Sequence, residues 1–250
     1  MPETVLVVPC YNEAERLDAQ AFRTFAATSA DVRLLFVNDG STDGTAEVLE
    51  ELCRDEPALD AMHLQTNQGK AGAVRAGILA ALETKPDLVG FWDADLSTPL
   101  AELPAFLAVF EKHTDIEMVF GARVNLLGRS IRRKLSRHYI GRVFATVVAT
   151  TLQLPVYDTQ CGAKVFRVTE DLADLFREPF LSKWIFDVEI IARSIASRRG
   201  TDRPPVTEII YELPLMSWYD VDGSKLRLSD VAVVARDFVR IYRKYVRSAG

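Results

Sequence analysis

The sequence has few cysteines and no excess of basic residues. Its three cysteines, Cys10, Cys53 and Cys161, lie far apart along 250 residues and show no metal-type spacing. This usage is typical of reduced thiols in a cytosolic protein. The net charge is −5, which argues against bulk nucleic-acid binding. We therefore expect free thiols and no nucleic-acid partner.

Long apolar segments and an export signal are also missing. The opening residues, MPETVLVVPCYNE, have neither the basic start nor the cleavage site of a signal peptide. The longest stretch without a charge, Val143–Tyr157, contains threonines, a glutamine and a proline, and it is shorter than the roughly 20 apolar residues that span a bilayer. The sequence thus predicts a cytoplasmic protein, and any contact with a membrane must be peripheral, on its cytoplasmic face.

What is present is an alternation of strand and helix patterns. Hydrophobic residues make up 48% of the chain, enough for one large core. Strand candidates are 4–9, 32–37, 61–65, 87–92 and 116–121, and helix candidates are 45–54, 69–83 and 99–113. This order predicts an α/β fold with a doubly wound, mostly parallel sheet. In such a fold, ligands bind outside the carboxyl ends of the strands.

The loops that follow the predicted strands are polar. They contain residues 11–13, 38–41, 67–70 and 93–95, which should meet at one edge of the sheet. No GxGxxG follows the first strand and no GxxxxGK[ST] occurs, which argues against a dinucleotide enzyme or a P-loop NTPase. The sequence therefore predicts a ligand-binding crevice that binds phosphate without either of these glycine-rich loops.

Asp93 and Asp95 end the apolar run in VGFWDADLSTP. Paired like charges repel unless a cation neutralises them, and carboxylates suit Mg²⁺ or Mn²⁺ held with few protein ligands and the phosphates of a substrate. Such an ion would stabilise a diphosphate leaving group. The same short pattern also occurs in exposed loops and helix caps. Similarly, NDGSTDGT with Asp39 suits a base or ribose contact, but also a turn that begins a helix.

Taken together, these motifs resemble a known enzyme family. VVPCYNEAERL, FVNDGSTDGT, NQGKAGAVRAGI and FWDADLSTP are similar, in this order, to motifs of the inverting family 2 glycosyltransferases, which have a GT-A fold. Within them, the chain most resembles dolichyl-phosphate glucosyltransferases and dolichyl-phosphate mannose synthases, over about residues 4 to 230. The resemblance implies Mg²⁺ or Mn²⁺ on Asp93 and Asp95, with Asp95 among the catalytic residues. It implies that the nucleoside diphosphate sugar is bound by Pro9, Tyr11, Asn12, Glu13, Asp39, Ser41, Gly69, Lys70 and Asp93.

The segment from Arg123 to Tyr157 contains no acidic residue. Its basic residues are Arg123, Arg129, Arg132, Arg133, Lys134, Arg137 and Arg142. Such a bias in an acidic protein predicts an anionic partner. The stretch RSIRRKLSRHYIGRVFATVV also has an apolar face, as in a helix at a membrane interface, although a solvated basic helix on the core would look alike.

A polyprenyl phosphate would satisfy both the charge and the apolar face of this segment, because arginines bind phosphate and apolar side chains meet the lipid tail. The resemblance to the mannose synthases implies that Arg123, Arg132 and Ser136 bind this phosphate. YDTQCGAKVFR resembles the DTQCGFK stretch of the glucosyltransferases, with Ala163 in place of the usual aromatic residue. It implies that Asp158 and Gln160 lie near the sugar or the metal, with Asp158 among the catalytic residues and Gln160 among those that bind the acceptor phosphate.

Asp187 in KWIFDVEII begins a predicted helix. In relatives that act on hydroxyl acceptors, a carboxylate near this position is a general base, whereas a phosphate acceptor is already ionised and needs none. Asp187 is therefore either a site residue or an acid favoured at a helix N-terminus.

The last part of the sequence carries one further donor motif and a basic end. WYDVDGSKLR resembles the family's GSKL element, which implies that Lys225 approaches the donor phosphates. Tyr219 and Ser97 stand where mannose synthases carry arginine and often glutamine, which favours a UDP-glucose-like donor. We expect one GT-A domain over residues 1–225, with a nucleotide-sugar half (1–125) and an acceptor half (126–225). A basic amphipathic helix over 226–250 should dock on the core or on anionic lipid.

The sequence favours an enzyme that transfers a hexose to polyprenyl phosphate with inversion. Two alternatives are a family 2 enzyme with a sugar or glycerolipid hydroxyl acceptor, in which Asp187 is the base, and a non-catalytic nucleotide-sugar-binding module. The intact Asp93 and Asp95 pair disfavours the last.

Overall fold

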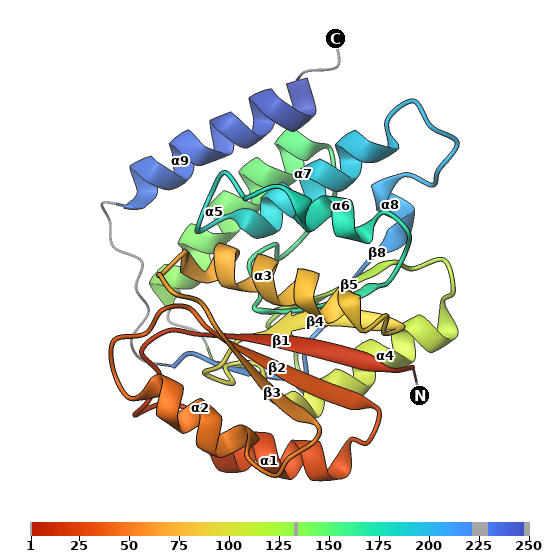
Figure 1. Cartoon of the computed structure of the whole chain (residues 1–250). Coiled ribbons are helices and arrows are strands. Elements are labelled where there is room, and N and C mark those ends of the chain that lie inside the picture. Colours follow the sequence, from red (N-terminus) through yellow and green to blue (C-terminus); the bar gives the residue numbers. More distant parts are fainter. Residues whose placement is uncertain (1, 133–134, 222–229, 248–250) are drawn as a thin grey trace.

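The computed structural model describes residues 2–132, 135–221 and 230–247; for residues 135–140, 230 and 231 it describes the backbone only. A central sheet lies between two layers of helices (Figure 1). Its strands are β1 (Thr4–Cys10), β2 (Val32–Asn38), β3 (Leu59–His63), β4 (Leu88–Trp92), β5 (Met118–Ala122), β7 (Ala163–Arg167) and β8 (Ile210–Pro214). Their order is β3-β2-β1-β4-β7-β5-β8, and only β7 runs antiparallel to its neighbours. The predicted α/β fold with a mostly parallel sheet is confirmed.

Two apolar clusters fix the helices on the two faces of the sheet. Alternation along β1 sends Val5 and Val7 into one cluster and Leu6 and Val8 into the other. The Leu6 side is covered by α1 (Ala19–Thr28), α2 (Thr45–Cys53), the 3₁₀ turn η1 (Leu100–Glu102) and α4 (Leu103–Lys112). The Val5 side is covered by α3 (Gly69–Glu83), α5 (Leu135–Leu152), α6 (Leu172–Arg177), α7 (Phe186–Arg198) and α8 (Val206–Ile209).

The C-terminal helix docks on the core. Helix α9 (Asp230–Ile241) continues into a π-helical segment, Tyr242–Arg247, and runs along the outside of the upper helical layer (Figure 1). Ile241 is fully buried, Phe238 packs against the same cluster as α7, and Tyr245 donates a hydrogen bond to Glu189 (3.3 Å). The sequence left open whether this helix docks on the core or on anionic lipid. In the structure its apolar face packs on the core.

A short parallel ribbon, β6 (Ser130–Arg132) with β9 (Ser217–Tyr219), lies apart from the main sheet. No helix among the described residues is long and apolar enough to cross a membrane. The cysteines Cys10, Cys53 and Cys161 are free thiols, as expected.

Candidate active site

The loops after β1 and β2 are bonded to each other. Asn12 adopts a left-handed conformation (φ 53°), its N–H donates to Ser41 Oγ (3.0 Å), and its Oδ1 accepts from the Thr42 N–H (2.9 Å). The Glu13 N–H donates to Thr45 Oγ1 (2.8 Å). These contacts place two of the predicted polar clusters at the carboxyl ends of neighbouring strands, as the parallel order requires.

Asp39 joins this edge to the start of α3. Its side chain is buried, its Oδ1 accepts from the Gln68 N–H (2.7 Å), and its own N–H donates to the Cys10 carbonyl (2.8 Å). Burial raises the pKa of Asp39. Gly69 follows with φ +80°, a conformation that suits glycine. The structure thus brings Asp39, Gly69 and Lys70 together, although their clusters lie about 30 residues apart in sequence.

The Asp93–Asp95 pair follows β4 at the same edge. Asp93 forms an ion pair with Lys70, and Asp95 accepts from the Ser97 N–H (2.9 Å). Burial and the Asp93 charge raise the pKa of Asp95. A Cβ built on Gly162 would lie 1.8 Å from Asp93 Oδ2, and the Asp93 N–H donates to the Gly162 carbonyl (3.0 Å). The carboxylate of Asp93 therefore packs directly on the backbone that leads into β7.

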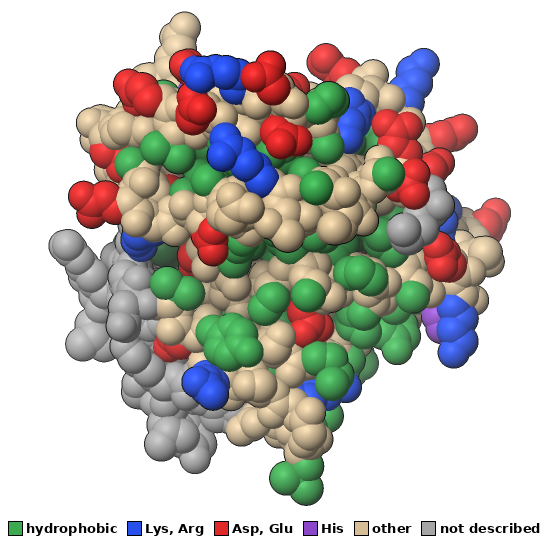
Figure 2. Space-filling view, turned by 90° about the horizontal axis from the view of Figure 1, so that it is seen from below, with side chains coloured by type: hydrophobic (Ala, Val, Ile, Leu, Met, Phe, Trp, Pro, Cys, Tyr) green, Lys and Arg blue, Asp and Glu red, His purple; other side chains and the backbone are tan. Residues whose placement is uncertain are grey.

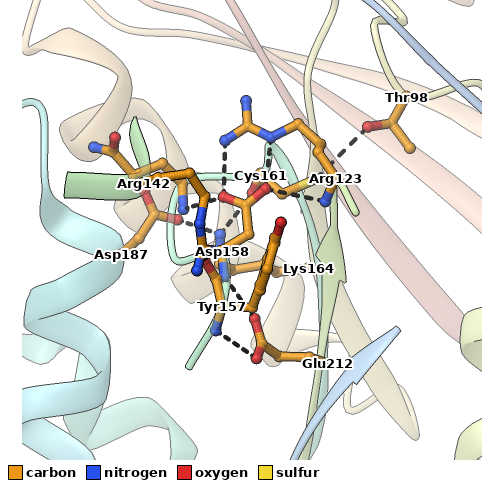
Figure 3. A network of polar contacts seen from close by, with 10 residues as sticks. Thr98, Arg123, Arg142, Tyr157, Asp158, Cys161, Lys164, Asp187 and Glu212 are labelled. Atoms are coloured by element: carbon orange, nitrogen blue, oxygen red, sulfur yellow. Dashed lines mark hydrogen bonds and ion pairs between the residues drawn. The ribbon is translucent and has the colours of Figure 1, made fainter. Parts of the chain in front are cut away.

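Arg123, which follows β5, forms a two-point ion pair with Asp158 (Figure 3). Arg123 Nε and Nη2 lie 2.6 and 2.8 Å from the carboxylate oxygens of Asp158. Burial alone would raise the pKa of Asp158, but Arg123 outweighs it and holds the pKa well below its usual range. Glu212 accepts the backbone N–H groups of Tyr157 (2.7 Å) and Asp158 (2.8 Å). Arg123 and Asp158, both predicted as site residues, thus form an ion pair with each other.

Lys164 was not predicted from the sequence as a site residue, yet it lies at the centre of this network. It is fully buried, with its Nζ 2.6 Å from Asp187 Oδ1, and it donates to the Cys161 carbonyl (2.6 Å). The rings of Phe91 and Phe120 lie 5.3 and 5.1 Å from its Nζ. The signal available in the sequence was a lysine inside the apolar stretch AKVF.

The other predicted residues lie around this network or outside the described part of the chain. Gln160 donates its N–H to Asp158 (3.1 Å) and lines a hollow with Tyr157 and Arg142. The Arg142 guanidinium lies 3.7 Å from the centre of the Tyr157 ring. Arg132 lies on β6, whereas the Ser136 side chain and all of Lys225 fall outside the described residues.

The carboxylate oxygens at this edge suit a hard cation such as Mg²⁺ or Mn²⁺, which commonly also binds the phosphates of a substrate. Among the described residues, no group of three or more His, Cys, Asp or Glu side chains is placed to hold a metal ion. Asp93 and Asp95 nevertheless offer two carboxylates, and Mg²⁺ commonly binds one or two carboxylates plus substrate phosphates. Burial and, after it, the charge of Asp93 raise the pKa of Asp95, and a bound cation would offset the repulsion between the two aspartates.

Comparison with known proteins identifies a matching family. The model of the family described as "Glycosyl transferase family 2" matches residues 5–171. The chain is 29% identical to a dolichyl-phosphate beta-glucosyltransferase of Trichomonas vaginalis, over 94% of this chain and 72% of that protein. It is 30% identical to the dolichyl-phosphate beta-glucosyltransferase of Saccharomyces cerevisiae, over 96% of this chain and 74% of that protein.

A solved structure with the same fold contains a metal and a nucleotide. Glucosyl-3-phosphoglycerate synthase from Mycobacterium tuberculosis, in complex with Mn²⁺, uridine diphosphate and phosphoglyceric acid, superposes with a TM-score of 0.64. The match covers 96% of this chain and 77% of that chain at 15% identity. At this identity, the likeness concerns the fold.

Proposed function

Because the chain belongs to glycosyl transferase family 2 and has the GT-A fold, we propose that it transfers a hexose, with glucose favoured, from a nucleoside diphosphate sugar to a polyprenyl phosphate. The observation that carries the proposal is the Asp93–Asp95 pair beside Lys70 at the carboxyl edge of the sheet. The dolichyl-phosphate glucosyltransferases among its relatives support this acceptor class.

The donor nucleotide would lie across the loops after β1 and β2. Asp39 is buried at their junction, and Asn12 and Ser41 are fixed by each other. Ionised Asp39 can accept a hydrogen bond from a base or ribose donor group. We assign the same role of donor binding to Pro9, Tyr11, Glu13, Gly69 and Lys225 from their motifs.

The donor diphosphate would lie between Lys70 and the two aspartates. Mg²⁺ or Mn²⁺ on Asp93 and Asp95 would supply charge stabilisation of the departing diphosphate. Lys70 adds a fixed positive charge at the same place, since it already pairs with Asp93. Gly162 and Ser97 limit where the two carboxylates can lie, because each contacts one of them. The protein thus contributes position and charge rather than a proton.

The acceptor phosphate would approach the hollow lined by Arg123, Arg142 and Gln160. Arg123 is already bonded to Asp158 at two points, so it presents a fixed guanidinium rather than a mobile one. A phosphate that is ionised at neutral pH attacks the anomeric carbon in line, on the side opposite the diphosphate, and inverts it. Arg132 and Ser136 complete the proposed phosphate site by resemblance. Because the tail of a polyprenyl phosphate lies in the bilayer, the proposal includes peripheral contact of the protein with a membrane.

The proposal is tested by measuring transfer from UDP-glucose, GDP-mannose and UDP-N-acetylglucosamine, each with and without Mn²⁺, to short polyprenyl phosphates. We expect metal-dependent transfer that is fastest from UDP-glucose. Transfer only to free sugars or to glycerolipid hydroxyls would select the alternative acceptor class. If no donor and acceptor pair gave turnover, the hypothesis of an enzyme would be rejected and that of a non-catalytic nucleotide-sugar-binding module would be kept.

Replacing Asp187 by Asn is expected to change turnover with a phosphate acceptor by no more than about threefold. Asp187 Oδ1 lies 2.6 Å from the Lys164 ammonium, and an asparagine side chain of the same size would keep an amide oxygen facing that cation. The measurement is kcat with polyprenyl phosphate, and the matched control is Asp115→Asn, an exposed position just before β5. A loss of several orders of magnitude in the Asp187 variant alone would make Asp187 an essential base.

A further inference from the structure

Four large hydrophobic side chains are exposed around the β6–β9 ribbon. Leu126 and Leu127 precede β6 and are 49% and 104% exposed, Met216 precedes β9 and is 56% exposed, and Tyr219 ends β9 at 41%. We call these four residues the apolar edge. Single exposed hydrophobic residues are common, but a group of them at one place marks a contact surface.

Hydrogen bonds hold the two parts of the apolar edge side by side. The Ser130 N–H donates to the Met216 carbonyl (2.8 Å), and Arg129 donates to the Pro214 carbonyl. The parallel register then pairs Arg132 with Tyr219. The loop before β6 and the turn before β9 therefore form one continuous surface, although they lie about 90 residues apart.

The apolar edge is held out of the core by ordered structure. The carboxylate of buried Glu102 accepts from the N–H groups of Met216 (3.1 Å) and Ser217 (2.8 Å) and from Ser217 Oγ (3.0 Å). On the other side, the Arg129 N–H closes a turn onto the Leu126 carbonyl (3.2 Å), with Gly128 at φ +81°. Both turns thus keep their apolar side chains in solvent instead of folding them inward.

The charged residues beside the apolar edge indicate what kind of partner it binds. Arg129 and Arg132 lie beside it, and Arg132 lies 5.9 Å from the centre of the Tyr219 ring. The segment that carries Leu126 and Leu127 has no acidic residue between positions 123 and 157, whereas on the other segment Asp220 follows Tyr219 and donates its N–H to the Arg132 carbonyl (3.0 Å). Apolar side chains flanked by arginine and tyrosine are the composition of a membrane interface, where the chains enter the acyl region and the cations meet anionic headgroups.

The wider surface agrees with this reading. In the view from below, acidic and basic side chains are both numerous in the upper part, while hydrophobic side chains show across the middle and lower part with single charged side chains among them (Figure 2). The lower part of that view is the side that lies at the back of Figure 1, where β5 and β8 are found. Hydrophobic side chains are therefore more frequent away from the most highly charged part of this face.

We propose that the apolar edge docks the protein on an anionic lipid bilayer, with Leu126 and Leu127 entering the acyl region. This inference rests on the proposed function. Arg123 lies at the start of the same loop, so docking would bring it to the bilayer surface, where the phosphate of a lipid acceptor lies. Residues 124–129, rather than the docked helix α9, form the principal contact.

The test is co-sedimentation of the full chain with vesicles of phosphatidylcholine containing about 30% phosphatidylglycerol, and with pure phosphatidylcholine vesicles. We expect Leu126→Ser/Leu127→Ser to weaken binding to the anionic vesicles at least about tenfold. The matched control, Val239→Ser, removes an exposed apolar side chain from α9 and should bind as the unmodified chain does. Equal binding by the double variant, or a loss confined to Val239→Ser, would overturn the proposal.

Two further measurements separate this inference from its alternatives. Transfer to a short, water-soluble polyprenyl phosphate without vesicles should be unchanged in the double variant, so that failure of the enzyme and failure of docking are distinguishable. Sedimentation velocity without lipid should show the same mass for both chains. A change in mass with unchanged vesicle binding would assign the apolar edge to a protein contact and reject the lipid.

Discussion

Asp95→Ala is expected to lower hexosyl transfer by about 1,000-fold or more, because removal of a metal carboxylate forfeits several kcal/mol of stabilisation of the departing diphosphate. Burial and the neighbouring Asp93 both raise the pKa of Asp95, and a cation bound by the two carboxylates would offset their repulsion. The measurement is kcat with UDP-glucose and polyprenyl phosphate at saturating Mn²⁺. A parallel calorimetric titration with UDP should show that Mn²⁺ no longer strengthens nucleotide binding.

The control for the Asp95 variant is Asp115→Ala, which removes an exposed carboxylate just before β5. It should retain both transfer and the effect of Mn²⁺ on UDP binding. The Asp95 variant should also unfold within about 0.5 kcal/mol of the unmodified chain, since it relieves repulsion with Asp93. Transfer that survived in Asp95→Ala without any need for metal would refute the proposed mechanism.

The elements that the sequence predicted best are those whose pattern is local. Residues 69–83 form α3 as expected, because the run that begins at Gly69 is rich in alanine, the best helix former, and contains no proline. The continuous apolar runs of β1, β2 and β4 identify buried parallel strands. β3 begins at Leu59, two residues before the predicted 61–65, since Leu59 is its one buried residue and its apolar signal is therefore weak.

What the sequence did not predict depends on long-range pairing. β7 is short, antiparallel and carries a lysine, so the local pattern of AKVFR does not indicate a central strand. Arg123 and Asp158 were each expected to face a ligand, and the structure bonds them to each other across 35 residues. The partner of a buried charge is set by the fold and not by any spacing in the sequence.

Lys164→Met is expected to lower the free energy of unfolding by about 3–5 kcal/mol, the cost of leaving a buried charge without its partner. The side chain is fully buried and faces Asp187, which is itself only 5% exposed. A loss of this size is a large share of the roughly 5–15 kcal/mol that stabilises a typical protein. Urea unfolding at pH 7 measures it as a lower midpoint with an unchanged m-value. Lys112→Met, at an exposed position in the last turn of α4, should stay within about 0.5 kcal/mol.

Lys164→Met/Asp187→Leu separates the stabilising role of the pair from its effect on the active site. With both charges removed, most of the lost stability should return, since an apolar pair of similar volume often replaces a buried ion pair without cost. Transfer should not return with it. The Cys161 carbonyl loses the Lys164 donor in both variants, and the following Gly162 contacts the Asp93 carboxylate. Full recovery of Mn²⁺-dependent transfer in the double variant would mean that Lys164 stabilises the fold without positioning Asp93.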